Sequence, residues 1–400
     1  MRLRTFESFW LVKNGILYSY PSLQSDSKTE ILVIGGGITG ALISHALMEA
    51  GHKVMLIDRR DIAMGSSSAT TSMLQYEIDV PMYLLSEMIG EEAAAICYQA
   101  GIEAILEMKK LVESTKIDCG FEMKESLYLA HSKKASVWLK QEFAIRDKYK
   151  LGVKWLSASE VKAKYGLICH GAILSEVAAS VDAYQLAHEL IQLNVKRGMK
   201  VYDQTDIDQI ETSGKNPKVI LKTGHSIEAK KIVCCTGFES TKLLKEKIAD
   251  LFYTYATVSE QGIKLNKNIQ NTLIWNTGDP YLYMRTTDDG RFLVGGEDSG
   301  ANFQFFQQKI KERKAEKLVK KLEEIMPEVN FIEDFSWGGT FGTTKDGLPY
   351  IGKSPEYENT LFVLGFGGNG ITFSVQGMEM IQNFLQGKDH KLAEYYRFGR

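Results

Sequence analysis

Three glycines near the N-terminus have the spacing that lets a protein backbone approach a phosphate. They lie in Gly35-Gly36-Gly37-Ile38-Thr39-Gly40, which contains a Gly-x-Gly-x-x-Gly pattern. The first glycine permits a tight turn, the second admits a pyrophosphate, and the third lets a helix pack closely on a strand. The helix that follows offers free N–H groups and a partial positive charge to the phosphates. Asp58, 18 residues beyond Gly40, is placed to accept hydrogen bonds from an adenosine ribose. The segment therefore predicts a dinucleotide site.

Three later segments bear on whether the dinucleotide is NAD or FAD, which share an ADP half. The loop 65–72 is dense in small hydroxyls that could bind a pyrophosphate and a ribityl chain, although a flexible linker has the same composition. The apolar segment 231–237 ends in small residues and could lie against a ligand. Residues 366–372 form a second glycine turn before a helix, and its anion-binding N–H groups suit the N1–C2=O edge of a reduced flavin; a plain turn is the alternative. A long ligand touched by both ends of the chain favours FAD, because NAD leaves the C-terminal turn without a role.

A further candidate site comes from side-chain alternation. Tyr281, Tyr283 and Arg285 are spaced by two residues, so on a strand they share one face. If that face looks toward the flavin, Arg285 could bind an anionic group and the tyrosines could form an aromatic wall. A solvated face together with core packing explains the spacing equally well. The seven histidines show no ligand spacing, and we predict no metal site.

The elements that must position these residues are of two kinds. Strand 30–34, helix 41–50 and strand 53–57 form a strand–helix–strand unit around the first glycine turn. Helix 183–196, strand 199–202, a hairpin of 218–222 with 226–229, and strand 231–235 continue it. Between them, 82–114 and 134–149 have helical periodicity, 251–300 is rich in strand formers, and 307–325 is a basic helix. We interpret the lysines of this last helix, Lys311, Lys314, Lys317 and Lys321, as a solvated face.

These patterns predict an α/β fold in which the chain leaves its nucleotide domain and returns to it. We expect an N-terminal arm at 1–29, irregular in structure, and a Rossmann-like domain assembled from the discontinuous segments 30–80, 171–250 and 336–396. Segments 81–170 and 251–335 are expected to form a second domain built on an antiparallel sheet.

Composition excludes several other classes of protein. Of 400 residues, 44% are hydrophobic and 24% charged, which is typical of globular chains and not of disordered or fibrous ones. The net charge of −2 gives no basic field for nucleic acid or acidic lipid. Five cysteines with no CxxC pair suit a reducing compartment. No apolar run approaches the ~20 residues of a membrane span, and we expect no signal peptide. A cytoplasmic protein without nucleic-acid partner or membrane span is the expectation.

From about Tyr20 to Gly387 the sequence resembles the D-amino-acid oxidase superfamily of FAD-dependent amine oxidoreductases. The resemblance rests on the order and spacing of the first glycine turn with Asp58, the 65–72 loop, 235–237, Trp337-Gly338-Gly339, 346–352 and 365–370. It implies an FAD domain built from separated segments, with the sheet of a substrate domain covering the flavin. It also implies that the backbone of Ile207 holds the adenine.

Departures from the family pattern are as informative as the matches. Phe341 stands where amino-acid oxidases of the family carry an arginine for the substrate carboxylate, and Thr372 where sarcosine oxidases carry a lysine. Gly339 falls at the position of a cysteine that attaches FAD covalently, so we predict noncovalent FAD. An apolar residue near Leu293 replaces the lysine that promotes the reaction with oxygen.

The resemblance and the departures together predict oxidation of a C–N bond in a small amine or amino-acid-like molecule, with oxygen or another electron acceptor. FAD-dependent oxidation of a 2-hydroxy acid is one alternative, with His170 or Tyr76 as a weak base; a noncatalytic flavin-bound protein is another. Arg285, Tyr283 and Asn369 are the candidates for positioning the substrate and the flavin. The predicted cofactor-binding residues are Gly35, Gly37, Ile38, Thr39, Gly40, Asp58, Arg59, Arg60, Ser66, Ser67, Ser68, Thr70, Thr71, Ile207, Thr236, Gly237, Gly339, Gly368, Asn369, Gly370, Ile371 and Thr372.

Overall fold

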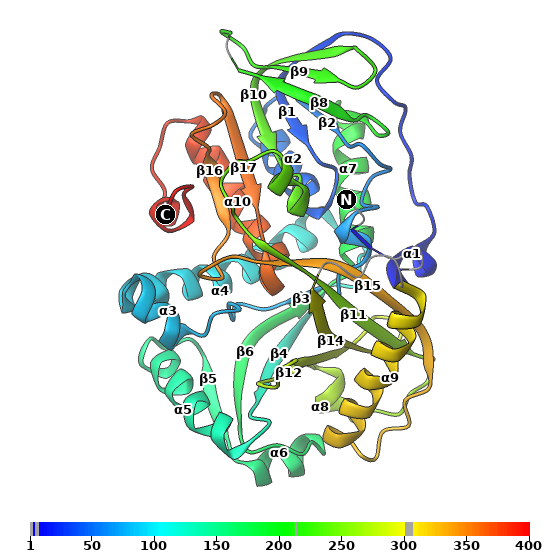
Figure 1. Ribbon diagram of the computed structural model, residues 1–400, viewed down its shortest axis with the longest axis vertical. Coiled ribbons are helices and arrows are strands. Elements are labelled where there is room, and N and C mark those ends of the chain that lie inside the picture. The colour runs from blue at the N-terminus through cyan, green and yellow to red at the C-terminus, as the bar shows by residue number, and fades with distance from the viewer. Residues whose placement is uncertain (1–2, 5–7, 213, 301–306) are drawn as a thin grey trace.

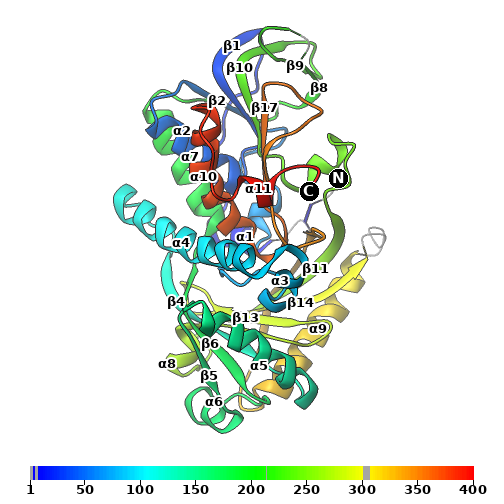
Figure 2. The ribbon, with the colours of Figure 1, turned by 90° about the vertical axis from the view of Figure 1, so that its left-hand side faces the viewer.

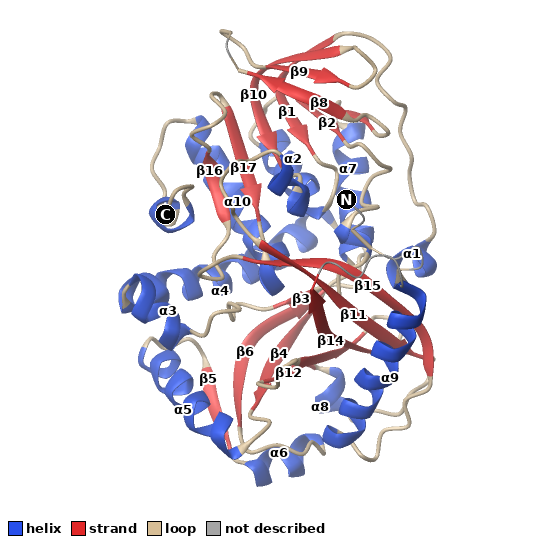
Figure 3. Cartoon of the chain, viewed as in Figure 1, coloured by secondary structure: helices blue, strands red, loops and turns tan. Residues whose placement is uncertain are grey.

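A computed structural model describes residues 3–4, 8–212, 214–300 and 307–400. Figure 1 shows two sheets, one in the upper and one in the lower half of the molecule, with helices packed around each. Figure 3 shows that helices and strands are both present in the upper and the lower half. The mixed α/β prediction is confirmed.

The upper sheet is formed largely from parallel strands in the order β16-β17-β10-β1-β2-β7, and a hairpin of β8 and β9 joins it through β10. Its strands are β1 (Ser27–Ile34), β2 (Val54–Ile57), β7 (Lys200–Tyr202), β8 (Ile207–Glu211), β9 (Lys218–Leu221), β10 (Ser226–Cys234), β16 (Tyr350–Lys353) and β17 (Thr360–Leu364). Every residue of Ile31–Ile34 and of β2 is buried, because both faces of these strands are covered. β10 pairs in parallel with β1 on one side and with β17 on the other. In both pairs the partner strands are more than a hundred residues apart in sequence, so the sheet joins distant parts of the chain.

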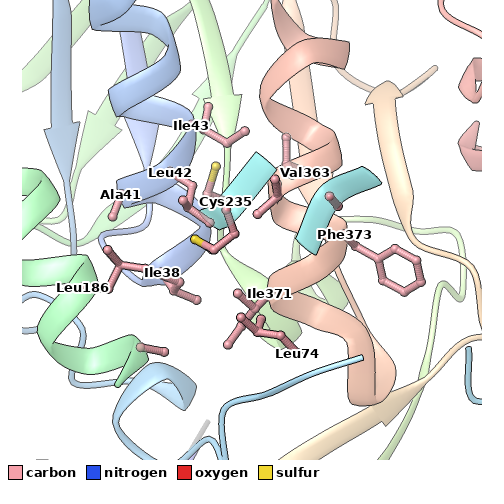
Figure 4. Close-up of a cluster of buried hydrophobic side chains, with 14 of the residues drawn as sticks. Ile38, Ala41, Leu42, Ile43, Leu74, Leu186, Cys235, Val363, Ile371 and Phe373 are labelled. Carbon is pink, nitrogen blue, oxygen red and sulfur yellow. The ribbon is translucent and has the colours of Figure 1, made fainter. Parts of the chain in front are cut away.

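Three helices cover one face of this sheet side by side (Figure 2): α2 (Ile38–Glu49), α7 (Ala183–Lys196) and α10 (Gly370–Leu385). Figure 4 shows the contact between α2 and α10, where Ile38, Leu42 and Ile371 point into one apolar cluster. Cys235 and Val363, at the ends of neighbouring strands, close the cluster from the sheet side. Because α2 follows the first glycine turn and α10 follows the second, this packing fixes the two turns relative to each other.

The lower sheet has the order β15-β11-β14-β13-β12-β4-β6-β3, with β5 paired to β6. Its strands are β3 (Met73–Leu74), β4 (Glu122–Leu129), β5 (Val153–Leu156), β6 (Ala172–Ser180), β11 (Asp250–Ser259), β12 (Thr272–Asn276), β13 (Leu282–Thr286), β14 (Phe292–Gly300) and β15 (Glu333–Thr343). Neighbours are antiparallel except β4 and β12, which are parallel. β3, β6 and residues 336–343 of β15 pair in this sheet, although these residues fall within the ranges expected of the Rossmann-like domain.

The remaining helices are α1 (Phe9–Asn14), α3 (Met82–Ile89), α4 (Glu91–Thr115), α5 (Lys133–Lys148), α6 (Ala158–Tyr165), α8 (Lys267–Gln270), α9 (Gln307–Ile325) and α11 (Ala393–Tyr396), with short 3-10 turns η1 (Ser66–Ser68), η2 (Gly237–Lys242) and η4 (Gly367–Asn369). The expected helix 82–114 is divided, because Gly90 has a φ of 92° and ends α3 before α4 begins. A capping box formed by Ser157 and Glu160 opens α6.

Two expectations were wrong in detail. The arm 1–29 is not wholly irregular: its described part contains α1, in which Phe9 and Trp10 are buried against the core. The lysines of α9 are not simply solvated, because Lys314 and Lys321 form ion pairs with the buried Glu297 of β14. Periodicity shows which helix face is apolar, but it cannot show that a neighbouring strand presents a carboxylate to the polar face.

Candidate functional site

A cavity of about 920 Å³ runs between the two sheets and is lined by both glycine turns. Ligand sites commonly measure roughly 300–1,000 Å³, so the cavity is large enough for an extended ligand. Its upper part is formed by the ends of the upper-sheet strands. Its lower part is formed by strands of the lower sheet and by α5.

The first glycine turn has the geometry that its spacing predicts. A Cβ on Gly40 would lie 1.8 Å from the carbonyl oxygen of Gly35, so Gly40 permits the close approach of α2 to the turn and does not itself line the cavity. Gly35 has a φ of 108° and borders the cavity with Gly37, Ile38 and Thr39. Ser67 Oγ accepts a hydrogen bond from the Ile38 N–H at 2.9 Å, so the hydroxyl loop meets the helix N-terminus here.

Asp58 lies at the end of β2 and holds the turn together. Its two carboxylate oxygens accept hydrogen bonds from the N–H groups of Gly36, at 2.7 Å, and of Arg60, at 2.8 Å. Burial raises the pKa of Asp58 to about 6, and these two hydrogen bonds partly oppose the shift. Each carboxylate oxygen can accept a second hydrogen bond, which leaves capacity for a ribose hydroxyl in the cavity.

The neighbouring positive and negative side chains close the upper end of the cavity. Arg59 and Arg60 both form ion pairs with Glu239 of η2, and all three line the cavity. Ile207, at the start of β8, lines it together with Lys222, Thr236 and Gly237. The resemblance assigned the adenine to Ile207, and the structure brings that residue to this end.

The hydroxyl loop is fixed by tryptophans from two distant segments. Trp10 Nε1 donates to the carbonyl of Thr70 at 2.6 Å, and Trp337 Nε1 donates to that of Ala69 at 2.8 Å. Ser66, Ser67, Thr70 and Thr71 line the cavity, and so does Gly339. Ser68 does not, because its hydroxyl turns back to the carbonyl of Gly65.

The second glycine turn contains an interaction that the sequence did not reveal. Gly368, Asn369, Gly370 and Ile371 line the cavity, but the Gly368 N–H donates to the carboxylate of Asp79 at 3.0 Å. Gly370 and Ile371 begin α10, so their N–H groups have no partner within the helix. The N-terminal end of α10, rather than the Gly368 N–H, therefore faces the cavity, and its partial positive charge favours an anionic edge there.

Two of the predicted cofactor-binding residues near this turn form hydrogen bonds within the protein. Asn369 donates through its side chain to the carbonyl of Gln75 at 2.8 Å, and Thr372 donates to the same carbonyl at 3.2 Å. Asn369 still lines the cavity, whereas Thr372 does not.

Arg285 does not reach the cavity. Tyr281 and Tyr283 line it, but Arg285 is 2% exposed, lies under the ring of Trp10, and donates to the carbonyl of Val181. Burial lowers the pKa of Arg285 to about 10. The alternation of the strand was correctly interpreted, but α1 covers this end of the face, so the proposed contact of Arg285 with substrate is not supported.

The lower part of the cavity holds residues that sequence inspection did not select. Aromatic walls come from β4, α5 and β12, through Tyr128, Trp138 and Trp275. Carboxylates come from Glu77, Asp79 and Asp298. Apart from Glu77 and Asp79, which are two residues apart, these side chains are distant in sequence and fit no compact motif, so only the fold brings them together.

Three general properties of the described residues bear on the class of protein. No group of three or more His, Cys, Asp or Glu side chains there is arranged to hold a metal ion. Within the same residues, no helix has the length and apolar character needed to cross a bilayer. All five cysteines are free thiols.

Comparison with known proteins defines the class. Residues 30–382 match the FAD dependent oxidoreductase family, DAO, and the chain belongs to this family. It is therefore an FAD-dependent oxidoreductase, and an enzyme of the type to which amino-acid oxidases and dehydrogenases belong.

Individual relatives are distant. The chain is 25% identical over 394 residues to a Bacillus subtilis (strain 168) protein provisionally named as a Rieske 2Fe-2S iron-sulfur protein, covering 96% of this chain and 74% of that one. It is 23% identical over 372 residues to glycine oxidase of Geobacillus kaustophilus (strain HTA426), covering 90% and 93%. The crystal structure of glycine oxidase from Geobacillus kaustophilus superimposes with a TM-score of 0.78 at 19% identity, over 94% of this chain and 99% of that one, and shows the shared fold.

Proposed function

We propose that this enzyme oxidises a C–N bond of a small amine, with FAD bound noncovalently in the cavity between the sheets. The observation that carries the proposal is the continuity of that cavity, from Ile207 and Asp58 at one end, past both glycine turns, to aromatic walls at the other. The cavity suits FAD in the chemistry of its lining residues as well as in its length. Gly37 faces it without a side chain, and serine and threonine hydroxyls border its middle. Gly339 offers no thiol for covalent attachment.

Bound FAD supplies a hydride acceptor at N5. The residues of this chain then have two tasks: they hold the amine carbon in place and they exclude water. In the reaction, an amine bound as its ammonium form first gives one proton to water, which leaves the nitrogen with a free lone pair. The α C–H bond then breaks with its electron pair leaving as hydride, a C=N bond forms from the nitrogen lone pair, and the nitrogen gives a second proton to water. Water hydrolyses the resulting imine, and oxygen or another electron acceptor takes up the electrons.

The hydroxy-acid alternative is less well supported, because it needs a base for the substrate hydroxyl. His170 is exposed and does not line the cavity. Tyr76 also lies outside it, with its hydroxyl within 3.3 Å of Ser175 Oγ and the carbonyl of Leu151. Neither side chain is in a position to reach a substrate.

The test is anaerobic mixing of the holoenzyme with small amines and with 2-hydroxy acids, followed by the flavin absorbance. We expect amines to bleach the flavin and hydroxy acids to leave it oxidised. Bleaching by hydroxy acids alone would favour the alternative, and no bleaching by either class would favour a noncatalytic role.

A further inference from the structure

The lower part of the cavity has a one-sided charge. The cationic side chains among the described residues that line the whole cavity are Arg59, Arg60, Lys222 and Lys242. All four follow strands of the upper sheet or lie in η2, at the end assigned to the adenosine and phosphates. Around the lower part, the described ionisable side chains of fixed charge are the carboxylates of Glu77, Asp79 and Asp298.

These carboxylates are not fully satisfied by the protein. Glu77 has a completely buried side chain; one oxygen accepts from Ser175 Oγ at 2.7 Å, and Oε2 has no hydrogen-bond partner. Arg146 lies between Glu77 and Glu142, so this buried group of three keeps a net charge of −1. A buried carboxylate oxygen without a donor is costly, and a cationic ligand in the cavity would lower that cost.

Asp79 and Asp298 form a second negative group. Asp79 is an exposed residue that borders the cavity, and partial desolvation by the surrounding protein raises its pKa to about 6; the Gly368 N–H opposes this shift, and the charge of Asp298 adds to it. The Oδ1 atom of Asp298 is also buried without a hydrogen-bond partner. The side chains of Tyr281 and Thr254 lie beside Asp298. The charges of Lys314 and Glu297 also act on Asp298, and these two residues form an ion pair in which Lys314 Nζ lies 3.1 Å from Glu297 Oε2. A cation in the cavity would relieve the repulsion between the two aspartates.

The walls around these groups are aromatic. Tyr128 and Trp275 stack with ring centroids 3.5 Å apart, and Trp138 meets the edge of Tyr128 at 6.0 Å. Tyr281 and Tyr283 lie 5.7 Å apart on the β13 side. Aromatic faces attract ammonium groups, and the attraction is larger where water is excluded. Phe341, at the position of the family's carboxylate-binding arginine, lines the same cavity and offers no charge.

We infer that the substrate is a cationic amine with no carboxylate beside the reacting C–N bond, held by Asp79 and Asp298 within aromatic walls. This inference rests on the proposed function and narrows it. An α-amino acid would bring its carboxylate next to three acidic groups, and none of the described cationic side chains lines this part of the cavity to pair with it. The ammonium group of a simple amine can pair with the carboxylates and can also lie against the aromatic faces of the site.

Binding is tested first with compounds that need not react. Isothermal titration of the holoenzyme with benzyltrimethylammonium and with benzoate compares a cation and an anion of similar shape, and neither changes charge between pH 5.5 and 8. We expect the cation to bind at least about tenfold more tightly, with an affinity that rises with pH as Asp79 ionises near pH 6. Equal or tighter binding of benzoate would overturn the inference.

Variants locate the effect. Asp298→Asn and Asp79→Asn should each weaken binding of benzyltrimethylammonium by about tenfold or more, and Asp79→Asn should also remove most of the pH dependence. Asp389→Asn, at an exposed position outside the cavity, is the matched control and should change nothing. If both cavity variants bind the cation as the wild type does, the carboxylates do not hold the substrate.

Reaction with matched compounds separates this inference from the proposed function. Benzylamine and phenylglycine share a benzylic C–N bond and differ by the α-carboxylate, and mandelate replaces the amine by a hydroxyl. We expect anaerobic bleaching to be fastest with benzylamine. Faster bleaching by either enantiomer of phenylglycine would overturn the inference and leave C–N oxidation standing. Bleaching by mandelate alone would overturn the proposed function, whatever the binding result.

Discussion

Replacing Gly40 by alanine should separate α2 from the first glycine turn and weaken FAD binding. The new Cβ would lie 1.8 Å from the Gly35 carbonyl oxygen, whereas ordinary contact begins at 3.4 Å. The turn or the helix must therefore shift by about 1.6 Å, and the obstacle is backbone that cannot rotate away. Overpacking of this kind costs about 1–3 kcal/mol in the free energy of unfolding. Losing one charge-assisted hydrogen bond to phosphate costs about 1.5–3 kcal/mol, which is at least about tenfold in Kd.

The assay for Gly40→Ala is titration of the apoprotein with FAD, followed by flavin fluorescence, together with chemical unfolding of the apoprotein. Gly214→Ala is the control, because its Cβ would meet no atom closer than 3.5 Å and the residue is exposed. An unchanged Kd for FAD in Gly40→Ala would refute the assignment of the turn. An equal loss of FAD affinity in Gly40→Ala and Gly214→Ala would show that any glycine replacement has this effect.

Three further variants test the packing and the electrostatics of the site. Trp10→Ala should destabilise the protein by about 3–5 kcal/mol and weaken FAD binding, because it creates a cavity and releases the Thr70 carbonyl; denaturant unfolding and FAD titration measure the two effects. Because folding raises the pKa of Asp58 from 3.8 to about 6, the apoprotein should lose stability as pH rises from about 4 to 6, by up to about 3 kcal/mol, and Asp58→Asn should flatten that slope; an unchanged slope would contradict the assignment. Arg146→Met should cost about 3–5 kcal/mol in unfolding free energy, because it leaves Glu77 and Glu142 buried without a cation; restored stability in a triple variant without the two acids would support this cause.

The cofactor half of the site could be predicted because its determinants are local in sequence. The glycine turn, the helix after it and Asp58 fall within one strand–helix–strand unit, so spacing alone indicates their arrangement. The second turn before α10 was recognisable for the same reason. The apolar segments Ile31–Ile34 of β1 and 232–234 of β10 are buried, as is typical of parallel strands, and the two strands do pair in parallel.

The substrate half could not be predicted, because no local pattern marks it. Asp79 follows a short strand, and its bond to Gly368 joins residues 289 positions apart. Arg285 was placed on the correct strand face, but nothing in its own segment shows that Trp10 covers it. Its exclusion from the cavity is a property of tertiary packing.

The visible spectrum of the purified protein, recorded before and after acid precipitation, tests the central claim most directly. The account predicts flavin absorbance in the native protein, with the colour passing into the supernatant as FAD. Colour retained in the pellet would mean covalent attachment and would contradict the role given to Gly339. A colourless protein that FAD cannot reconstitute would contradict the assignment of the cavity itself.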